Sequence, residues 1–141
     1  MKLLVAALAA LVLTTQFAVA EDASSGLMAD FGGKPGLVKV VDDLMINLLA
    51  EPKTKESFIN TDQKRIKTML VDQFCEVMGG GCKYTGKTMA QSHSGLDIKR
   101  GEFNSLVESL RSAMSKNNVP MRAQNKLLAL LAPMHRDIIG K

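Results

Sequence analysis

Tryptophan, tyrosine, histidine and cysteine are scarce in this chain of 141 residues, and their scarcity limits the chemistry it can perform. It has no tryptophan, one tyrosine, two histidines and two cysteines, whereas methionine occurs nine times. There is no C-x-x-C motif, which argues against a redox dithiol, and no C-x-x-C-H motif, which argues against covalently attached c-type haem. No basic run alternates with aromatic residues and the net charge is only +4, so nucleic acid is not an expected partner.

Alternation of apolar and polar residues with a period of two is also missing, and so are internal repeats. These absences argue against a sheet and against a repeat architecture. Apolar residues instead recur at helical spacing in several segments. The sequence therefore predicts an all-α fold, with a single domain over residues 21–141 that is long enough to bury a sizeable core.

The first twenty residues have the pattern of a signal peptide. Lys2 gives a positive start, residues 3–12 form an unbroken apolar core, and Ala18-Val19-Ala20 is the small-x-small pattern cut by signal peptidase. The apolar core is short for a membrane span, although an uncleaved anchor remains the alternative. We expect cleavage after Ala20, export to the periplasm or the medium, and no stable membrane insertion of the mature chain. The residue directly after the cut is Glu21 and not a cysteine, which argues against a lipoprotein.

The two cysteines flank a run of glycines in the segment CEVMGGGC. A chain reversal at residues 79–81 would bring Cys75 and Cys82 together, and an oxidising compartment would let them pair. Closing so short a loop would stabilise the fold by about 2.5 kcal/mol in the chain-entropy model. Two separate thiols remain the alternative, because the sequence does not determine the distance between the two Cα atoms.

Apolar residues at helical spacing predict four long helices. They are expected over Leu37–Leu49, from a cap at Thr61 or Asp62 to the glycine run at 79–81, over Lys99–Lys116, and from Pro120 through Met134. The first should end near Glu51, because Pro52 disfavours helical geometry in the residue before it. A short helix over Thr88–His93 is expected between the second and the third.

Two segments lack a clear helical pattern. Residues 21–31 are expected to form a loose leader that ends in a turn at Gly32-Gly33. The segment KTKESFIN is polar apart from Phe58 and Ile59, and it is expected to be a short turn region that places one aromatic side chain in the core.

His93 is the candidate for binding a metal. It ends the short predicted helix, and Met89 lies four residues earlier on the same face. A neutral imidazole held in this way is a good axial ligand for haem iron. On composition alone a structural histidine remains the alternative, and methionine-rich faces are often core packing. His135 is better explained as a surface residue favoured by a helix C-terminus.

A series of motifs follows one another through most of the chain. The order is FGGKPG, an apolar helix ending LLAEP, then SF, FCEVMGGGCKYTGKTMAQSHSGLDI and EFNSLVESL, within residues 31–138. This series, and above all the run GG-x-x-x-YTG-x-x-M-x-x-x-H, closely resembles the group I truncated haemoglobins. The resemblance implies a two-over-two helical sandwich around noncovalent haem b, and the signal peptide would make this an exported variant.

The resemblance also implies roles for individual residues. His93 matches the proximal iron ligand, and Phe58 matches the aromatic that packs against the porphyrin. Phe74 matches an aromatic near the distal channel, and Lys67 lies where a cation could meet a haem propionate. The positions that match the pocket wall are Tyr84, Met89, Ile98 and Phe103. Packing, or a solvated charge for Lys67, is the alternative at each position.

The sequence departs from the family on the distal side of the implied pocket. Members that hold oxygen tightly use a tyrosine in the first long helix and a glutamine in the next, but Met45 and Leu70 occupy these positions here and Ile66 a third. None of the three can donate a hydrogen bond, and one to a charged group contributes about 1.5–3 kcal/mol. Oxygen is therefore expected to dissociate quickly. Nothing resembles a distal acid–base pair, so only weak peroxidase or NO dioxygenase activity stays open.

Met69 gives a second hypothesis. It stands where some family members supply an internal sixth ligand, there a nitrogen donor, and a thioether would give a His/Met pair as in electron-transfer cytochromes. Distal packing is the alternative for Met69. The sequence thus predicts a haem b protein that binds O₂, NO or CO reversibly. The other hypotheses are a His/Met electron carrier in the cell envelope, whose redox partner is unknown, and a secreted helical interaction domain without a cofactor.

Overall fold

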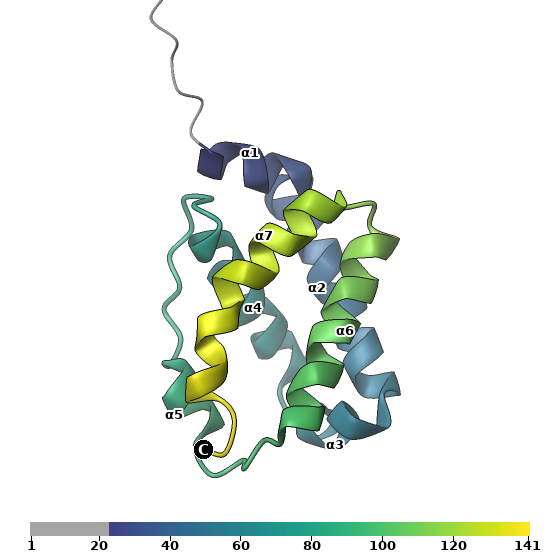
Figure 1. Ribbon diagram of the computed structural model, residues 1–141, viewed down its shortest axis with the longest axis vertical. Helices are drawn as coiled ribbons and strands as arrows, with labels where there is room; N and C mark the ends of the chain where they lie inside the picture. The colour runs from purple at the N-terminus through teal and green to yellow at the C-terminus, as the bar shows by residue number, and fades with distance from the viewer. Residues whose placement is uncertain (1–22) are drawn as a thin grey trace, which may run out of the picture.

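The computed structural model describes residues 23–141, which form helices joined by short connections (Figure 1). Residues 1–22, with the predicted signal peptide and its cleavage site, lie outside the described residues. The α-helices are α1 (Ala23–Asp30), α2 (Gly33–Ala50), α3 (Pro52–Ile59), α4 (Gln63–Val77), α5 (Met89–His93), α6 (Arg100–Lys116) and α7 (Met121–Leu131), followed by the 3-10 helix η1 (Ala132–Asp137). The predicted all-α class is confirmed.

Four helices form two layers. α2 and α4 pack together in the rear layer, and α6 and α7 cross in front of them (Figure 1). α2 also contacts α1, α3 and α6, which makes it the central helix. The apolar stripe expected for this helix is buried along its whole length. Its members are Leu37, Val40, Val41, Leu44, Met45 and Leu48. The helix ends at Ala50, as the position of Pro52 predicts.

The loose leader expected over residues 21–31 is wrong in its described part, because α1 occupies Ala23–Asp30. Leu27, Met28 and Phe31 are buried in the core. Leu27 and Met28 lie in α1 and Phe31 in the turn that follows it, but two turns are too short for a periodic pattern to stand out. Contacts with α2 and α7 stabilise this helix, as tertiary packing generally does for short helices.

The turn region expected for KTKESFIN is also wrong, because α3 is a helix over Pro52–Ile59. Pro52 occupies the first turn, where its missing N–H has no helical partner and its fixed φ suits the helix. The Glu51 side chain accepts a hydrogen bond from the backbone N–H of Lys53 at 3.2 Å and caps the helix. Thr54 is buried although it is polar. The helix therefore depends on caps and burial rather than on an apolar pattern.

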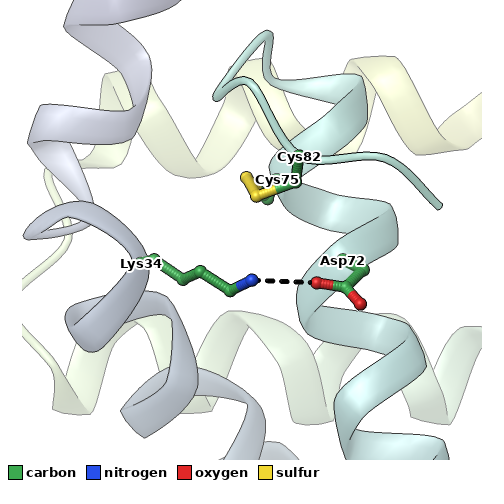
Figure 2. The surroundings of a disulfide bond; sticks show 4 residues. All are labelled: Lys34, Asp72, Cys75 and Cys82. Carbon is green, nitrogen blue, oxygen red and sulfur yellow. Dashed lines mark hydrogen bonds and ion pairs between the residues drawn. A yellow bond between two sulfur atoms is a disulfide. The ribbon is translucent and has the colours of Figure 1, made fainter.

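α4 begins and ends where the sequence predicts. Asp62 accepts a hydrogen bond from the backbone N–H of Arg65 at 3.0 Å, and Met78 separates the last helical residue, Val77, from the glycine run. A disulfide joins Cys75 to Cys82 across that run, with 5.6 Å between the Cα atoms (Figure 2). The pairing that the sequence leaves open is therefore present in the structure.

The disulfide-bonded turn lies against α1. A Cβ atom on Gly80 would be 2.7 Å from Cγ of Met28 and 2.8 Å from Sγ of Cys75, so only glycine permits this approach. Nearby, the ammonium of Lys34 at the start of α2 lies 3.0 Å from a carboxylate oxygen of Asp72 on α4 (Figure 2). These contacts join the N-terminal segments to the end of α4.

The C-terminal part of the chain returns to α5. α7 follows Pro120 as predicted, but the last helix tightens into η1 after Leu131. Ile139 then forms an isolated parallel bridge with Ile98, and the C-terminus lies beside α5 (Figure 1). Within residues 23–141, no helix is long and apolar enough to cross a membrane.

Candidate functional site

His93 is the last residue of α5, a helix of 5 residues. A capping box starts this helix: the Thr88 hydroxyl accepts from the N–H of Gln91 at 3.2 Å, and the Gln91 side chain accepts from the N–H of Thr88 at 3.0 Å. Gly95, with a φ of 80°, follows the helix in the left-handed conformation that glycine adopts readily. These local signals place His93 at the end of a short helix, as the sequence predicts.

The imidazole of His93 is oriented by its own helix. Its Nδ1 lies 2.8 Å from the carbonyl oxygen of Met89. Because a carbonyl can only accept, Nδ1 carries the proton in this bond and the lone pair of the neutral ring resides on Nε2. The side chain is half-buried. A metal-binding histidine typically has this arrangement, with one nitrogen bonded to a backbone carbonyl and the other available as a ligand.

This donor fits the noncovalent haem that the resemblance implies. A neutral Nε2 is the usual protein ligand of haem iron in globins. Apolar side chains that could cover a porphyrin are Phe58 on α3, Met89 on α5 and Phe103 on α6, and all three are half-buried. Ile98, in the segment between α5 and α6, is half-buried as well. The predicted roles of these residues toward haem stay predictions.

Tyr84, which is also expected to contact the cofactor, makes a local hydrogen bond, and its role toward haem stays a prediction. Its hydroxyl donates to the carbonyl of Lys87 at 2.8 Å. A Cβ on Gly86 would lie 2.4 Å from the Tyr84 hydroxyl oxygen, so the ring lies directly over this glycine. The aromatic side chain thereby stabilises the turn that leads from the disulfide to α5.

The residues expected to form the distal wall come from α2 and α4, which pack against each other. Met45 is buried on α2, and Ile66, Met69 and Leu70 are half-buried on α4. Phe74 is only 4% exposed and belongs to the core. Its burial with Val71 and Cys75 gives α4 a second apolar face, adjacent to the one predicted.

Lys67 forms an ion pair with another residue of the chain. Its ammonium lies 2.7 Å from a carboxylate oxygen of Asp42 on α2. Both residues border a surface hollow of about 510 Å³ that also reaches Met45 and Ile46. The ion pair therefore spans α2 and α4 beside the distal wall, and contact of Lys67 with a propionate stays a prediction.

Gln73 is a buried polar residue beside Met89 that the helical pattern of apolar residues does not identify. It is 7% exposed and lies on α4, three residues after Leu70 and four after Met69, so it shares their face. Its Nε2 donates to Sδ of Met89 at 3.3 Å and to Sδ of Met134 at 3.6 Å. Helical spacing alone could have placed Gln73 on this face, but a polar residue is passed over when only apolar positions are counted.

The sequence matches known proteins along most of its length. A family model described as "Bacterial-like globin" matches residues 27–139. A group 1 truncated hemoglobin of Mycolicibacterium paratuberculosis is 30% identical over 123 residues, which cover 87% of this chain and 89% of that protein. A group 1 truncated hemoglobin of Tetrahymena pyriformis is 24% identical over 110 residues, which cover 78% of this chain and 91% of that protein.

The fold matches solved structures as well. The crystal structure of truncated hemoglobin from Tetrahymena pyriformis, Fe(III) form, gives a TM-score of 0.78 at 23% identity and covers 82% of this chain and 98% of that chain. The 2/2 hemoglobin from Synechococcus sp. PCC 7002, in the cyanomet state and with covalently attached heme, gives 0.74 at 19% identity, covering 80% and 97%. At these identities the likeness concerns the fold, and it agrees with the two layers formed by α2, α4, α6 and α7.

Proposed function

Since this chain belongs to the bacterial-like globin family, we propose that His93 is the proximal ligand of its haem iron. Haem b is the cofactor, and haem-based binding of a diatomic gas such as O₂, NO or CO is the function. When bound, haem supplies an iron atom that takes up such a gas reversibly. The bond of 2.8 Å from Nδ1 of His93 to the Met89 carbonyl carries the proposal, because it leaves Nε2 available for iron.

The remaining side chains of the site would set its polarity. The Met89 carbonyl orients the His93 ring and makes Nε2 a stronger donor. Half-buried Phe58, Ile98 and Phe103 offer apolar surface that a porphyrin would cover. We assign these residues to haem binding through that surface.

The distal wall would control how firmly a gas is held. Met45, Ile66 and Leu70 have no group that can donate a hydrogen bond. We therefore expect oxygen to dissociate and to oxidise the iron quickly, whereas CO, which depends less on a donor, should bind readily. The fold and the relatives give no support to the alternative of a His/Met electron carrier.

We also propose that the protein is exported. Lys2, the apolar residues 3–12 and the sequence Ala18-Val19-Ala20 support a cleaved signal peptide. The disulfide between Cys75 and Cys82 supports an oxidising compartment, because such bonds are rare in the cytosol. The globin would then act in the periplasm or outside the cell.

The two histidines allow a matched test of the iron ligand. Protein purified with haem should show a Soret band and a CO-dependent shift in the ferrous form. His93→Ala should lose most of its haem, because it lacks the proximal donor. His135→Ala should keep it, because His135 lies on η1, outside the motif YTG-x-x-M-x-x-x-H that matches the iron ligand. It is a matched control, since its Nδ1 is bonded to the Ala132 carbonyl at 2.9 Å much as that of His93 is to the Met89 carbonyl. A wild-type Soret band and haem content in His93→Ala would contradict the assignment.

A further inference from the structure

The helix that carries His93 has few attachments of its own. All side chains of α5, a helix of 5 residues, stay at least partly exposed, so no core residue anchors it. Its principal neighbour among the helices is η1. An isolated helix of this length is unstable in water. The position of α5, and with it that of His93, must therefore depend on contacts that other elements make to this helix.

Gln73 provides such a bond from α4. Its side-chain nitrogen donates to the sulfur of Met89 on α5 at 3.3 Å and lies 3.6 Å from the sulfur of Met134 on η1. One buried amide therefore connects three elements. Figure 1 shows α5 at the lower end of the molecule, with the C-terminal segment beside it.

The residue that Gln73 contacts is also the one that orients the histidine. The carbonyl of Met89 accepts the bond from Nδ1 of His93 at 2.8 Å. The amide, the methionine and the imidazole thus form a continuous series. A shift of Met89 would move the acceptor of the His93 proton and rotate the ring.

Burying a glutamine at this position costs free energy of folding. Its neighbours on the same face, Met69 and Leu70, are apolar, and an amide loses its bonds to water when it is buried. Thioethers are weak acceptors, so the two bonds contribute little to stability. They are directional, however, and methionine has three rotatable side-chain bonds that packing alone leaves free. The amide can select one conformation of Met89 and Met134 where an apolar residue could not.

We propose that Gln73 is a positioning residue for the iron ligand, acting on His93 through Met89. The inference rests on the proposed ligation of haem by His93. It predicts that loss of the amide changes the strength and orientation of the bond between iron and histidine while the fold is retained.

Gln73→Met tests this proposal, because methionine has a similar length and cannot donate. The matched control is Gln124→Met: Gln124 is also buried, but its Nε2 bonds the Val119 carbonyl at 2.9 Å, in the connection between α6 and α7. Two properties are measured. They are the rate of haem transfer to excess apomyoglobin and the iron–histidine stretching frequency, recorded immediately after photolysis of the CO form so that a sixth protein ligand does not interfere.

Gln73→Met should shift the iron–histidine band and accelerate haem loss about twofold, less than the effect of one ordinary net hydrogen bond, because thioethers are weak acceptors. Gln124→Met should leave both unchanged even if it lowers the melting temperature. An unchanged band and rate in Gln73→Met would overturn the proposal, and so would equal changes in both variants.

A second variant covers the case in which Gln73→Met does not fold. This is the double variant Met89→Leu, Met134→Leu. It keeps the Met89 backbone carbonyl but removes both sulfur acceptors, so it should shift the iron–histidine band in the same way. An unchanged band there would overturn the proposal. The experiments also distinguish this outcome from an error in the proposed ligation of haem by His93. In that case the wild-type protein would lack an iron–histidine band altogether, or His93→Ala would retain the band.

Discussion

Asp43 on α2 is bound by two donors from the C-terminal end of α6. The Lys116 ammonium lies 2.6 Å from one carboxylate oxygen, and the Asn117 amide donates to the other at 2.8 Å. These bonds, that of Lys116 foremost, hold the pKa of Asp43 below its ordinary value of 3.8. A carboxylate with a lower pKa in the folded chain stabilises the fold above the unfolded pKa. That contribution is lost as the pH falls through the folded pKa.

Asp43→Asn should therefore lower the melting temperature near neutral pH and have little effect in strong acid. The difference from wild type should shrink as the pH falls below about 4, where the unfolded carboxyl takes up its proton. Thermal melts followed by far-UV circular dichroism between neutral and strongly acidic pH measure it. Glu76→Gln, which removes a charge from an exposed side chain, is the control. A difference that stays constant over the whole pH range would contradict the prediction.

The disulfide closes the turn that leads from α4 toward α5. It joins residues 7 apart in the sequence, and closing such a loop contributes about 2.5 kcal/mol in the chain-entropy model. Replacing both Cys75 and Cys82 by serine should lower the melting temperature by on the order of 10 °C.

Reduction of the wild type by dithiothreitol should have the same effect, and the double-serine variant should not respond to it. Mass spectrometry of the exported protein should show about two mass units less than the dithiol, because pairing removes two hydrogens. Two alkylatable thiols in native exported protein would show that the bond does not form in the cell.

Met69 lies on α4 between Ile66 and Leu70 in the sequence, and all three side chains are half-buried. We expect Met69 to pack in the distal wall, so that ferrous protein is five-coordinate and binds CO without delay. Met69→Ala should then leave the absorption spectrum nearly unchanged. Conversion of a six-coordinate, low-spin wild-type spectrum to a five-coordinate one in Met69→Ala would instead establish thioether ligation, which should also raise the reduction potential.

The signal peptide predicted over residues 1–20 should direct export of the whole chain. When the full sequence is expressed, intact mass and N-terminal sequencing of periplasmic protein should give a chain that begins at Glu21. Ala20→Tyr should block processing, because signal peptidase requires a small residue at this position. Protein that stays in the cytoplasm and begins at Met1 would contradict the proposed export.

The helices of the molecule could be predicted where the sequence signals for them are local. α2, α4, α6 and α7 carry apolar residues at helical spacing over several turns, and α5 has a capping box and a following glycine. Such signals involve neighbours within about four residues, so they are present before any tertiary contact forms. α1 and α3, with 8 residues each, are too short for periodicity to identify, and they form because the assembled core buries them or their caps suit a helix.

The sequence by itself determined the helical class, the place of His93 at the end of a short helix, and the apolar character of Met45, Ile66 and Leu70. Only the tertiary structure decided that Gln73 reaches Met89 and Met134, which are 16 and 61 positions away in the chain. It likewise decided that Lys67 faces Asp42 at a separation of 25. Contacts at such separations depend on how the helices pack against one another. Helical spacing fixes only which face of its own helix a residue occupies, and it leaves open the partner that this face will meet.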